Sequence, residues 1–221
     1  TYVLQGAVQH KDNHGGGGTI HPGDIQWMTA GSGLIHSEMP VADGDNFGLQ
    51  LWVNLPKKHK MAKPRYQSVL AKHQPTKTTK DGVTIKLVAG KSNGLSASIA
   101  LYTPVLYVDV TMTQANSKFT QEIPSDYQGF VYIFKGNSAV FNKNFKAKEK
   151  TMLVIDELNS NDTEQLPDHI TVENTKAETV RFFIICGKPI KEPVARYGPF
   201  VMNTQQEIQE AFDDYRNGKF Q

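Results

Sequence analysis

Cysteine is almost absent from this chain, which has one thiol, Cys186, among 221 residues. A single cysteine forms no internal disulfide and builds no cysteine-based metal cluster within one chain, which is typical of a reducing compartment. Long apolar runs are also missing, since segments such as residues 182–186 are far too short to span a bilayer. The first residues show no basic segment followed by an apolar one, so secretion is disfavoured. We therefore expect a soluble, intracellular protein that makes no membrane contact.

A strong excess of charge of one sign is missing as well. The chain has 24 Lys and Arg against 22 Asp and Glu, a formal net charge of +2. So small an excess does not indicate direct nucleic-acid binding. The sequence also contains no Gly-x-x-x-x-Gly-Lys-Ser/Thr phosphate loop and no Gly-x-Ser-x-Gly elbow, so it lacks two common enzyme signatures. Cys186 lies in an apolar strand pattern, where we expect a buried, inert thiol rather than a nucleophile.

Short β-strand patterns separated by turns make up most of what the sequence does contain. With 38% hydrophobic and 10% aromatic residues, the chain has enough apolar side chains to form a core. Strand patterns fill most of the first 55 residues, and residues 48–55 alternate with period two, as a half-buried strand does. A glycine run at residues 15–18 and the turn Pro22-Gly23-Asp24 separate these strands. The fold class is therefore predicted to be all-β.

Two β domains joined by a linker are predicted. The residues after position 55 become basic and polar, and strand patterns resume at residue 83. Apolar residues at helical spacing over residues 205–216 predict one short C-terminal helix. The strand-glycine-strand pattern of Tyr2–Val8 returns at residues 132–140, which favours a tandem duplication. The predicted boundaries are 1–68 for the first domain, 69–82 for the linker, and 83–221 for the second domain with the terminal helix.

The segment His36-Ser37-Glu38 is the most informative pattern for chemistry. On a strand, residues two apart project from the same face, so an imidazole and a carboxylate can converge on one metal ion. A non-haem Fe(II) centre uses two histidines and one carboxylate, and similar sites accept manganese, copper or nickel. On spacing alone, an exposed His-x-Glu pair is the commoner interpretation, because charged side chains are mostly exposed.

Longer motifs change that balance, because they resemble the pirin family of cupins. They are residues 22–39, which contain His36 and Glu38, residues 48–55, and residues 192–204 with the closing helix. The resemblance runs along nearly the whole chain. It implies two tandem cupin barrels, each a double-stranded β-helix or jelly roll, with one mononuclear iron in the N-terminal barrel.

The resemblance also implies a ligand set. In that family three histidines and one glutamate hold the metal; His36 matches the third histidine, and Glu38 matches the glutamate. The other two histidines form a His-Pro-His motif before the strand that Tyr2 begins, so we expect them upstream of Thr1 and interpret the chain as a fragment or processed product. Fe(II) is the expected cofactor, with other divalent metals as alternatives.

The remaining histidines are not expected to be ligands. His10 is predicted at a polar position on the rim or wall of the barrel, and His14 lies in the glycine-rich loop, where a fixed ligand is unfavourable. The corresponding region of the second domain has Glu122 and Asp126 but no histidine. The second barrel is therefore expected to bind no metal.

Two functions follow from the resemblance as hypotheses. The first is an iron-dependent quercetin 2,3-dioxygenase, which cleaves a flavonol ring with dioxygen; Glu38 would be a ligand, the base that removes the flavonol proton, or both. The alternative is a nuclear, iron-binding transcriptional co-regulator that binds a transcription factor in a redox-sensitive way, in the nucleus or the cytoplasm. The basic residues Lys57–Lys60 would then contact an acidic partner, although a solvated basic linker is the commoner interpretation.

Overall fold

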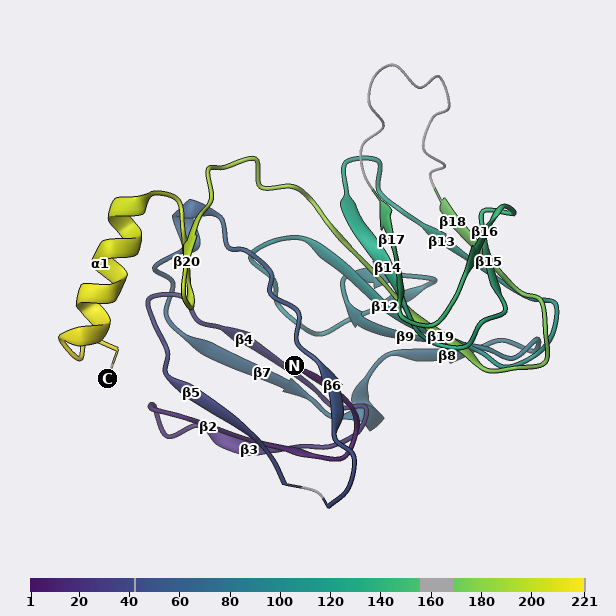
Figure 1. Ribbon diagram of the computed structural model, residues 1–221, viewed down its shortest axis with the longest axis horizontal. Coiled ribbons are helices and arrows are strands. Elements are labelled where there is room, and N and C mark those ends of the chain that lie inside the picture. Colours follow the sequence, from purple (N-terminus) through teal and green to yellow (C-terminus); the bar gives the residue numbers. More distant parts are fainter. Residues whose placement is uncertain (42, 156–168, 221) are drawn as a thin grey trace. The chain divides into compact units, whose positions relative to one another are not determined.

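The computed structural model describes residues 1–41, 43–155 and 169–220, which fold mainly into β-strands (Figure 1). Within these ranges there is one α-helix, α1 (Gln205–Arg216), and no helix is both long and apolar enough to cross a membrane. The chain divides into two compact units. The first comprises Thr1–His73 with Ile190–Gln221, and the second comprises Gln74–Pro189. The predicted all-β class with one terminal helix is confirmed.

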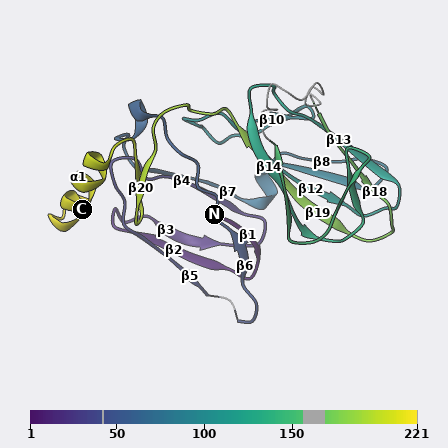
Figure 2. The same ribbon diagram turned by 45° about the horizontal axis from the view of Figure 1, so that its top comes forward.

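Two antiparallel sheets build the first unit (Figure 2). The sheet with the order β6-β1-β4-β7 has strands β1 (Tyr2–Gln5), β4 (Ile25–Thr29), β6 (Phe47–Leu49) and β7 (Arg65–Val69). The sheet with the order β3-β2-β5 has strands β2 (Val8–Asp12), β3 (Gly17–Ile20) and β5 (His36–Pro40). The chain passes from the first sheet to the second at Gly6, whose φ of 77° suits glycine. A Cβ atom there would lie 2.2 Å from Oδ1 of Asn46, so no other residue fits without a shift.

The C-terminal segment belongs to the first unit, and the predicted second domain is therefore wrong beyond residue 189. Its strands β20 (Ala195–Tyr197) and β21 (Phe200–Met202) pair with each other and contact α1. Three hydrogen bonds attach the segment to earlier residues of that unit: Lys60 Nζ to the Val201 carbonyl (2.9 Å), the Lys57 amide to the Glu192 carboxylate (2.6 Å), and the Asn13 side-chain amide to the Phe220 carbonyl. Sequence order alone could not show this return of the chain.

The predicted linker, residues 69–82, contains the boundary between the two units and also regular structure. The short 3-10 helix η2 (Ala71–His73) ends the first stretch of unit one, and β8 (Thr76–Thr78) pairs with a strand of unit two. A second short 3-10 helix, η1 (Lys57–His59), lies in the basic stretch before it. Lys60, expected in a solvated basic patch, is instead only 6% exposed.

The second unit is built from a six-stranded and a four-stranded antiparallel sheet and one short hairpin. The larger sheet has the order β17-β14-β19-β12-β9-β8, with β9 (Val83–Ala89), β12 (Val105–Met112), β14 (Gln128–Lys135), β17 (Thr151–Ile155) and β19 (Val180–Gly187) beside β8. The smaller sheet, β13-β18-β15-β16, has β13 (Ser117–Glu122), β15 (Ala139–Phe141), β16 (Phe145–Ala147) and β18 (His169–Asn174). The hairpin is β10 (Lys91–Ser92) and β11 (Leu95–Ser96).

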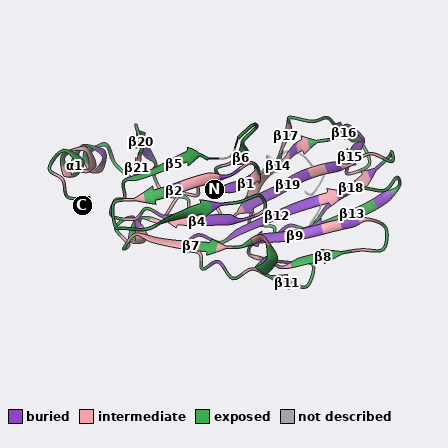
Figure 3. Ribbon diagram, turned by 90° about the horizontal axis from the view of Figure 1, so that it is seen from below, coloured by how far each residue is buried: buried purple, intermediate pink, exposed green. Residues whose placement is uncertain are grey.

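An apolar core fills the second unit (Figure 3). Nearly every residue of β12 and β19 is buried, and β13 alternates buried and exposed residues with period two. The side chains at its centre are 0% exposed: Val108, Val110, Met112, Ile133, Phe182 and Ile184. The buried carboxylate of Asp109 is paired with Arg181 through Nε to Oδ1 at 3.0 Å and Nη2 to Oδ2 at 2.5 Å. Burial of this apolar core is the main contribution to the folding free energy of the second unit.

Candidate functional site

Strands β2 and β5 bring the candidate metal-binding residues onto one face of a sheet. The two strands are antiparallel, with His10 opposite Glu38 and Asp12 opposite His36. Directly opposite residues on an antiparallel pair share a face, and residues two apart on one strand do as well. All four side chains therefore project from the same side of β3-β2-β5, as the His-x-Glu spacing predicts for His36 and Glu38.

Glu38 is held in place by two hydrogen bonds. Its Oε1 accepts from the Thr1 hydroxyl at 2.6 Å, and its Oε2 accepts from Nε2 of Gln50 at 2.8 Å. The Trp52 indole donates to Oε1 of Gln50 at 3.0 Å, which fixes the amide that faces Glu38. A carboxylate has about four lone-pair sites, so Glu38 keeps acceptor capacity for a further group.

His36 is exposed, and its ring leans toward a histidine that the sequence did not place in the site. The centroids of the His10 and His36 rings lie 5.7 Å apart. His10 is 0% exposed on β2, which fits the predicted position on the barrel wall and not the rim. The cross-strand register, set by the turn at Gly6, directs its side chain into the interior beside His36. The period-two alternation of the strand after Gly6 is the sequence signal that could have placed the His10 side chain on the inner face.

Tyr66 on β7 is the second residue that sequence reasoning missed. Its hydroxyl lies 2.9 Å from Nε2 of His10, and the two ring centroids are 4.6 Å apart. Burial lowers the pKa of His10, with His36 acting in the same direction and Asp12 and Glu38 opposing it. Burial also raises the pKa of the Tyr66 hydroxyl, and the nearby Asp12 and Glu38 carboxylates add to this shift. Both groups are therefore neutral near pH 7.

His36 and Glu38 are two of the donors that the predicted metal site needs. Imidazole and carboxylate donors on one strand suit a mononuclear Fe(II), Mn, Cu or Ni centre with open positions. Among residues 1–41, 43–155 and 169–220, however, no group of three or more His, Cys, Asp or Glu side chains is arranged to hold a metal ion. His36 and Glu38 thus fit half of the implied four-ligand set.

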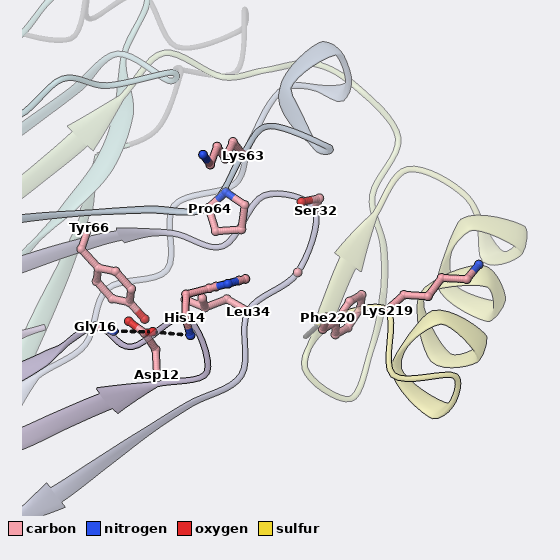
Figure 4. Close-up of a pocket in the computed structure, with 11 residues that line it drawn as sticks. Asp12, His14, Gly16, Ser32, Leu34, Lys63, Pro64, Tyr66, Lys219 and Phe220 are labelled. Carbon is pink, nitrogen blue, oxygen red and sulfur yellow. Dashed lines mark hydrogen bonds between the residues drawn. The ribbon is translucent and has the colours of Figure 1, made fainter.

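A cavity of about 520 Å³ opens beside this face of the first unit (Figure 4). It is lined by Asp12, His14, Gly16, Ser32, Gly33, Leu34, Lys63, Pro64, Tyr66, Lys219 and Phe220. Asp12 closes the loop that follows β2, because its Oδ1 accepts the amides of His14 at 2.7 Å and Gly16 at 2.9 Å. Desolvation opposes ionisation of Asp12, but these amide bonds prevail and lower its pKa.

The other histidines and the cysteine lie outside the His36–Glu38 pair, although His14 lines the neighbouring cavity. The side chains of His14, His21 and His73 are exposed, and that of His59 is half-buried. His169 begins strand β18 in the second unit. Cys186 is 2% exposed, and burial raises the pKa of its thiol to about 12, in keeping with an inert thiol. In the second unit Asp126 is ion-paired with Lys188 at 2.9 Å.

Comparison with known proteins identifies similar chains of both plants and animals. A family model described as "Pirin" matches residues 1–53, and one described as "Pirin C-terminal cupin domain" matches residues 107–221. A pirin-like protein from Solanum lycopersicum is 42% identical over 99% of this chain and 72% of its own length. Pirin from Rattus norvegicus is 39% identical, over 99% of this chain and 72% of its length.

One solved structure is similar over nearly the whole chain. The crystal structure of a quercetin 2,3-dioxygenase from Acinetobacter baumannii superposes with a TM-score of 0.87 and 33% sequence identity. The match covers 99% of this chain and 74% of that one. This similarity agrees with the predicted architecture of tandem cupin barrels.

Proposed function

The chain belongs to the pirin family of cupins, and we propose that it acts as a metal-dependent dioxygenase of the quercetin 2,3-dioxygenase type. The substrates would be a flavonol-like molecule and dioxygen, and the metal would be a mononuclear Fe(II) or another divalent ion. His36 and Glu38 are the proposed ligands from this chain, and the four-ligand set would need two further histidines. The similarity to the Acinetobacter baumannii enzyme supports the reaction class.

The observation that carries the proposal is the fixed pair on β5. Glu38 shares its face with His36, and its carboxylate is restrained by Thr1 and Gln50. Metal sites need fixed donor geometry, and partners that hold a ligand in place typically change metal affinity by about 10- to 100-fold. Ring contact with the buried His10 restricts His36 from the other side.

The residues of this chain would bind the metal, orient the Glu38 carboxylate and accept a proton from the substrate. When bound, the metal supplies Lewis acidity and one-electron chemistry toward dioxygen. Glu38 would accept the proton of the flavonol hydroxyl on a carboxylate oxygen, and Gln50 would hold that carboxylate in position through its Nε2. His36 would serve as a nitrogen donor to the metal. The proton thus moves from the substrate oxygen to a Glu38 oxygen.

Substitution of the two proposed ligands tests the site. In protein that carries its upstream residues, His36→Ala and Glu38→Ala should lower Fe(II) affinity by more than about tenfold, because each removes a direct donor. Quercetin consumption under oxygen should fall with it. Bound metal is measured by elemental analysis, and turnover by loss of quercetin absorbance.

His21→Ala is the matched control, because His21 is an exposed histidine of the same unit and lies outside β5. It should leave both readings unchanged. Full metal content and turnover in His36→Ala and Glu38→Ala would refute the proposal. Loss of turnover with full metal content in Glu38→Ala would assign Glu38 to the proton transfer alone.

A redox-sensitive co-regulator is the alternative function for the same metal face. It is favoured by apolar side chains left exposed in the first unit, since Met39 is 60% and Trp52 59% exposed, and exposed apolar groups occur at partner-binding surfaces. Capture of a nuclear protein partner that changes between ferrous and ferric protein would support it. Equal capture in both states, with quercetin turnover intact, would favour the enzyme.

A further inference from the structure

The hairpin of β15 and β16, with the turn that follows it, carries the densest run of positive charge in the second unit. Its lysines are Lys143, Lys146, Lys148 and Lys150, against one acidic residue, Glu149. All four lysine side chains are exposed. Among the described residues, none of their ammonium groups forms an ion pair. The run therefore presents uncompensated positive charge to the solvent.

Two of these lysines occupy turn positions that favour glycine. The turn from β15 to β16 is type I′: the Asn144 amide donates to the Phe141 carbonyl at 3.2 Å, and both central residues have positive φ. The second central residue is Lys143, with a φ of 67°, and Lys150, in the turn after β16, has a φ of 64°. Glycine adopts this backbone region freely, whereas lysine is strained there. Lysine at both positions costs the turns stability, which indicates a role for its charge outside the fold.

An exposed aromatic ring lies between these lysines. Phe145 begins β16, the edge strand of its sheet, and lies opposite Phe141 on β15 (Figure 1). Phe141 is 2% exposed and packs against Phe182, whereas Phe145 is 61% exposed. Lysine side chains around an exposed aromatic ring are the combination that proteins use at the surface of anionic membranes.

The use of lysine favours a lipid surface over other anionic partners. Residues 135–155 contain no arginine. Phosphorylated peptides are recognised by arginine clusters, because the planar guanidinium makes bidentate hydrogen bonds. Single-stranded nucleic acids stack successive bases on several aromatic side chains, and this hairpin exposes one such ring. A lysine ammonium is a compact point charge, which suits the diffuse negative potential of an anionic bilayer.

We propose that the β15–β16 hairpin is a peripheral docking surface for anionic lipid membranes. Its lysines bind the headgroup layer, and Phe145 inserts at the boundary between headgroups and acyl chains. Such contact needs no spanning segment, so the lack of long apolar runs, on which the sequence excluded membrane contact, does not bear on it. The surface belongs to the second unit and is independent of the metal chemistry proposed for the first.

Co-sedimentation with lipid vesicles tests this surface in the full chain, with a chelator present. The chain should bind phosphatidylcholine vesicles that contain roughly 30% phosphatidylserine, and it should not bind vesicles of phosphatidylcholine alone. Binding should weaken from about 0.1 M to about 1 M salt, because the Debye length falls from about 10 Å to about 3 Å. Equal binding to both kinds of vesicle, or none to the anionic kind, would overturn the proposal.

Replacement of the two strained lysines by glycine separates lipid binding from folding. In the double variant Lys143→Gly with Lys150→Gly, the affinity for anionic vesicles should fall by roughly 25-fold, at about fivefold for each lysine. Its melting temperature should equal or exceed that of the unaltered chain, because glycine relieves the strain. An unchanged affinity in this variant would overturn the proposal.

The matched control removes the same charge elsewhere in the second unit. Lys77→Gln with Lys80→Gln replaces two exposed lysines outside the hairpin. It should retain the affinity for anionic vesicles within about twofold, because charges beyond a Debye length of the membrane are screened. A loss equal to that of the double glycine variant would show that net charge alone attracts the chain, and would overturn the proposal.

Substitution of Phe145 tests insertion of the ring. Phe145→Ala should lower the affinity for anionic vesicles by roughly fivefold, because it removes the buried apolar area. Phe145→Trp should restore the affinity, because tryptophan favours the membrane interface, and its fluorescence should shift to the blue when anionic vesicles are added. Unchanged affinity in Phe145→Ala would contradict insertion. Binding of a single-stranded oligonucleotide, without vesicle binding, would assign the surface to nucleic acid and overturn the proposal.

Discussion

The two units bury different chemistry. The interior of the second unit is mainly apolar, with buried apolar side chains at the centres of β12 and β19, and it also buries hydrogen-bonded polar side chains such as Asp109 and Asn174. The interior of the first unit contains polar groups, including His10, Gln26 and Lys60, each less than 10% exposed. Buried polar groups cost free energy unless they are hydrogen-bonded, and polar groups make up a larger share of the buried side chains in the first unit. We therefore expect the first unit to depend more on specific pairs and the second more on buried apolar area.

Within the first unit, buried polar groups that are fully hydrogen-bonded and those that are not differ in what they do. Lys60 donates to both Asn54 and Val201, which ties the C-terminal segment to the N-terminal strands. Among the described residues, only Nε2 of His10 has a hydrogen-bond partner, the Tyr66 hydroxyl, and the His10 ring lies 5.7 Å from that of the proposed ligand His36. A buried polar atom that native packing leaves unpaired is a feature that calls for an explanation, and binding sites provide one.

Removal of an aromatic ring from the core of the second unit should have the largest effect on stability, and it tests the contrast between the two units. Phe182 is 0% exposed, and its ring lies 5.4 Å from that of Phe141 and 6.1 Å from that of Phe119. Phe182→Ala should lower the free energy of unfolding by about 3–5 kcal/mol, because it removes buried area and leaves a cavity. Urea denaturation followed by fluorescence measures the change.

Phe145→Ala is the matched control in the same unit, because Phe145 is 61% exposed on β16. It should change the free energy of unfolding by no more than about 0.5 kcal/mol. If the two variants lost equal stability, the view that the second unit depends on its buried core would be broken.

Strand positions and the terminal helix could be predicted from the sequence because their signals are local. Period-two alternation marks strands, and apolar residues at helical spacing mark α1. The local signal overestimated one strand: residues 48–55 alternate, but β6 ends at Leu49. Beyond it, Gln50 and Trp52 use their side chains to hold Glu38 instead of continuing the ladder.

The sequence predicted only the site residues that lie on a single strand. His36 and Glu38 share β5, so their common face follows from spacing alone. His10 and Tyr66 join them through strand pairing and through a hydrogen bond between residues 56 positions apart. The return of residues 190–221 to the first unit likewise depends on contacts such as Lys60 with Val201. Spacing along the chain carries no information about such contacts.

Loss of the buried ammonium of Lys60 should have an intermediate effect and tests whether specific pairs hold the first unit. Lys60→Met leaves the Val201 carbonyl without this donor, and we expect a loss of about 1–3 kcal/mol in the free energy of unfolding. Amide exchange of residues 200–216 should accelerate, because the segment loses an attachment. Lys58→Met, at an exposed neighbouring lysine, should leave both readings unchanged.

The pH dependence of the same variant sharpens the test. Burial lowers the pKa of Lys60 in the folded chain, with Glu192 and Glu207 opposing the shift. Between the folded-state and unfolded-state pKa values the unfolded chain binds more protons, so stability rises with pH in that window, below about 10.4. Lys60→Met should lack this rise. A stability difference between the two proteins that stays constant with pH would contradict it.

The smallest effect on stability is expected at the helix cap on the surface of the first unit, because the contact there is exposed rather than buried. Thr204 caps α1: its hydroxyl accepts from the Glu207 amide at 3.2 Å, while the Glu207 carboxylate accepts the amides of Asn203 and Thr204 at 2.9 Å each. Thr204→Ala should cost about 1 kcal/mol, and Thr204→Ser should restore most of it, because serine keeps the acceptor. Helical circular dichroism on heating measures both.

Acid should weaken the same cap in a way that Lys60 does not share. The amide of Asn203, and then that of Thr204, lower the pKa of Glu207 against the effect of burial. Its stabilising contribution is thus complete above the unfolded-state pKa of about 4.3 and is lost as pH falls through the lower folded-state value. Glu207→Gln should remove this acid dependence while Lys60→Met retains it. Acid loss of helix in Glu207→Gln equal to that of the unaltered chain would show that the segment is held by its buried contacts alone, as in the second unit.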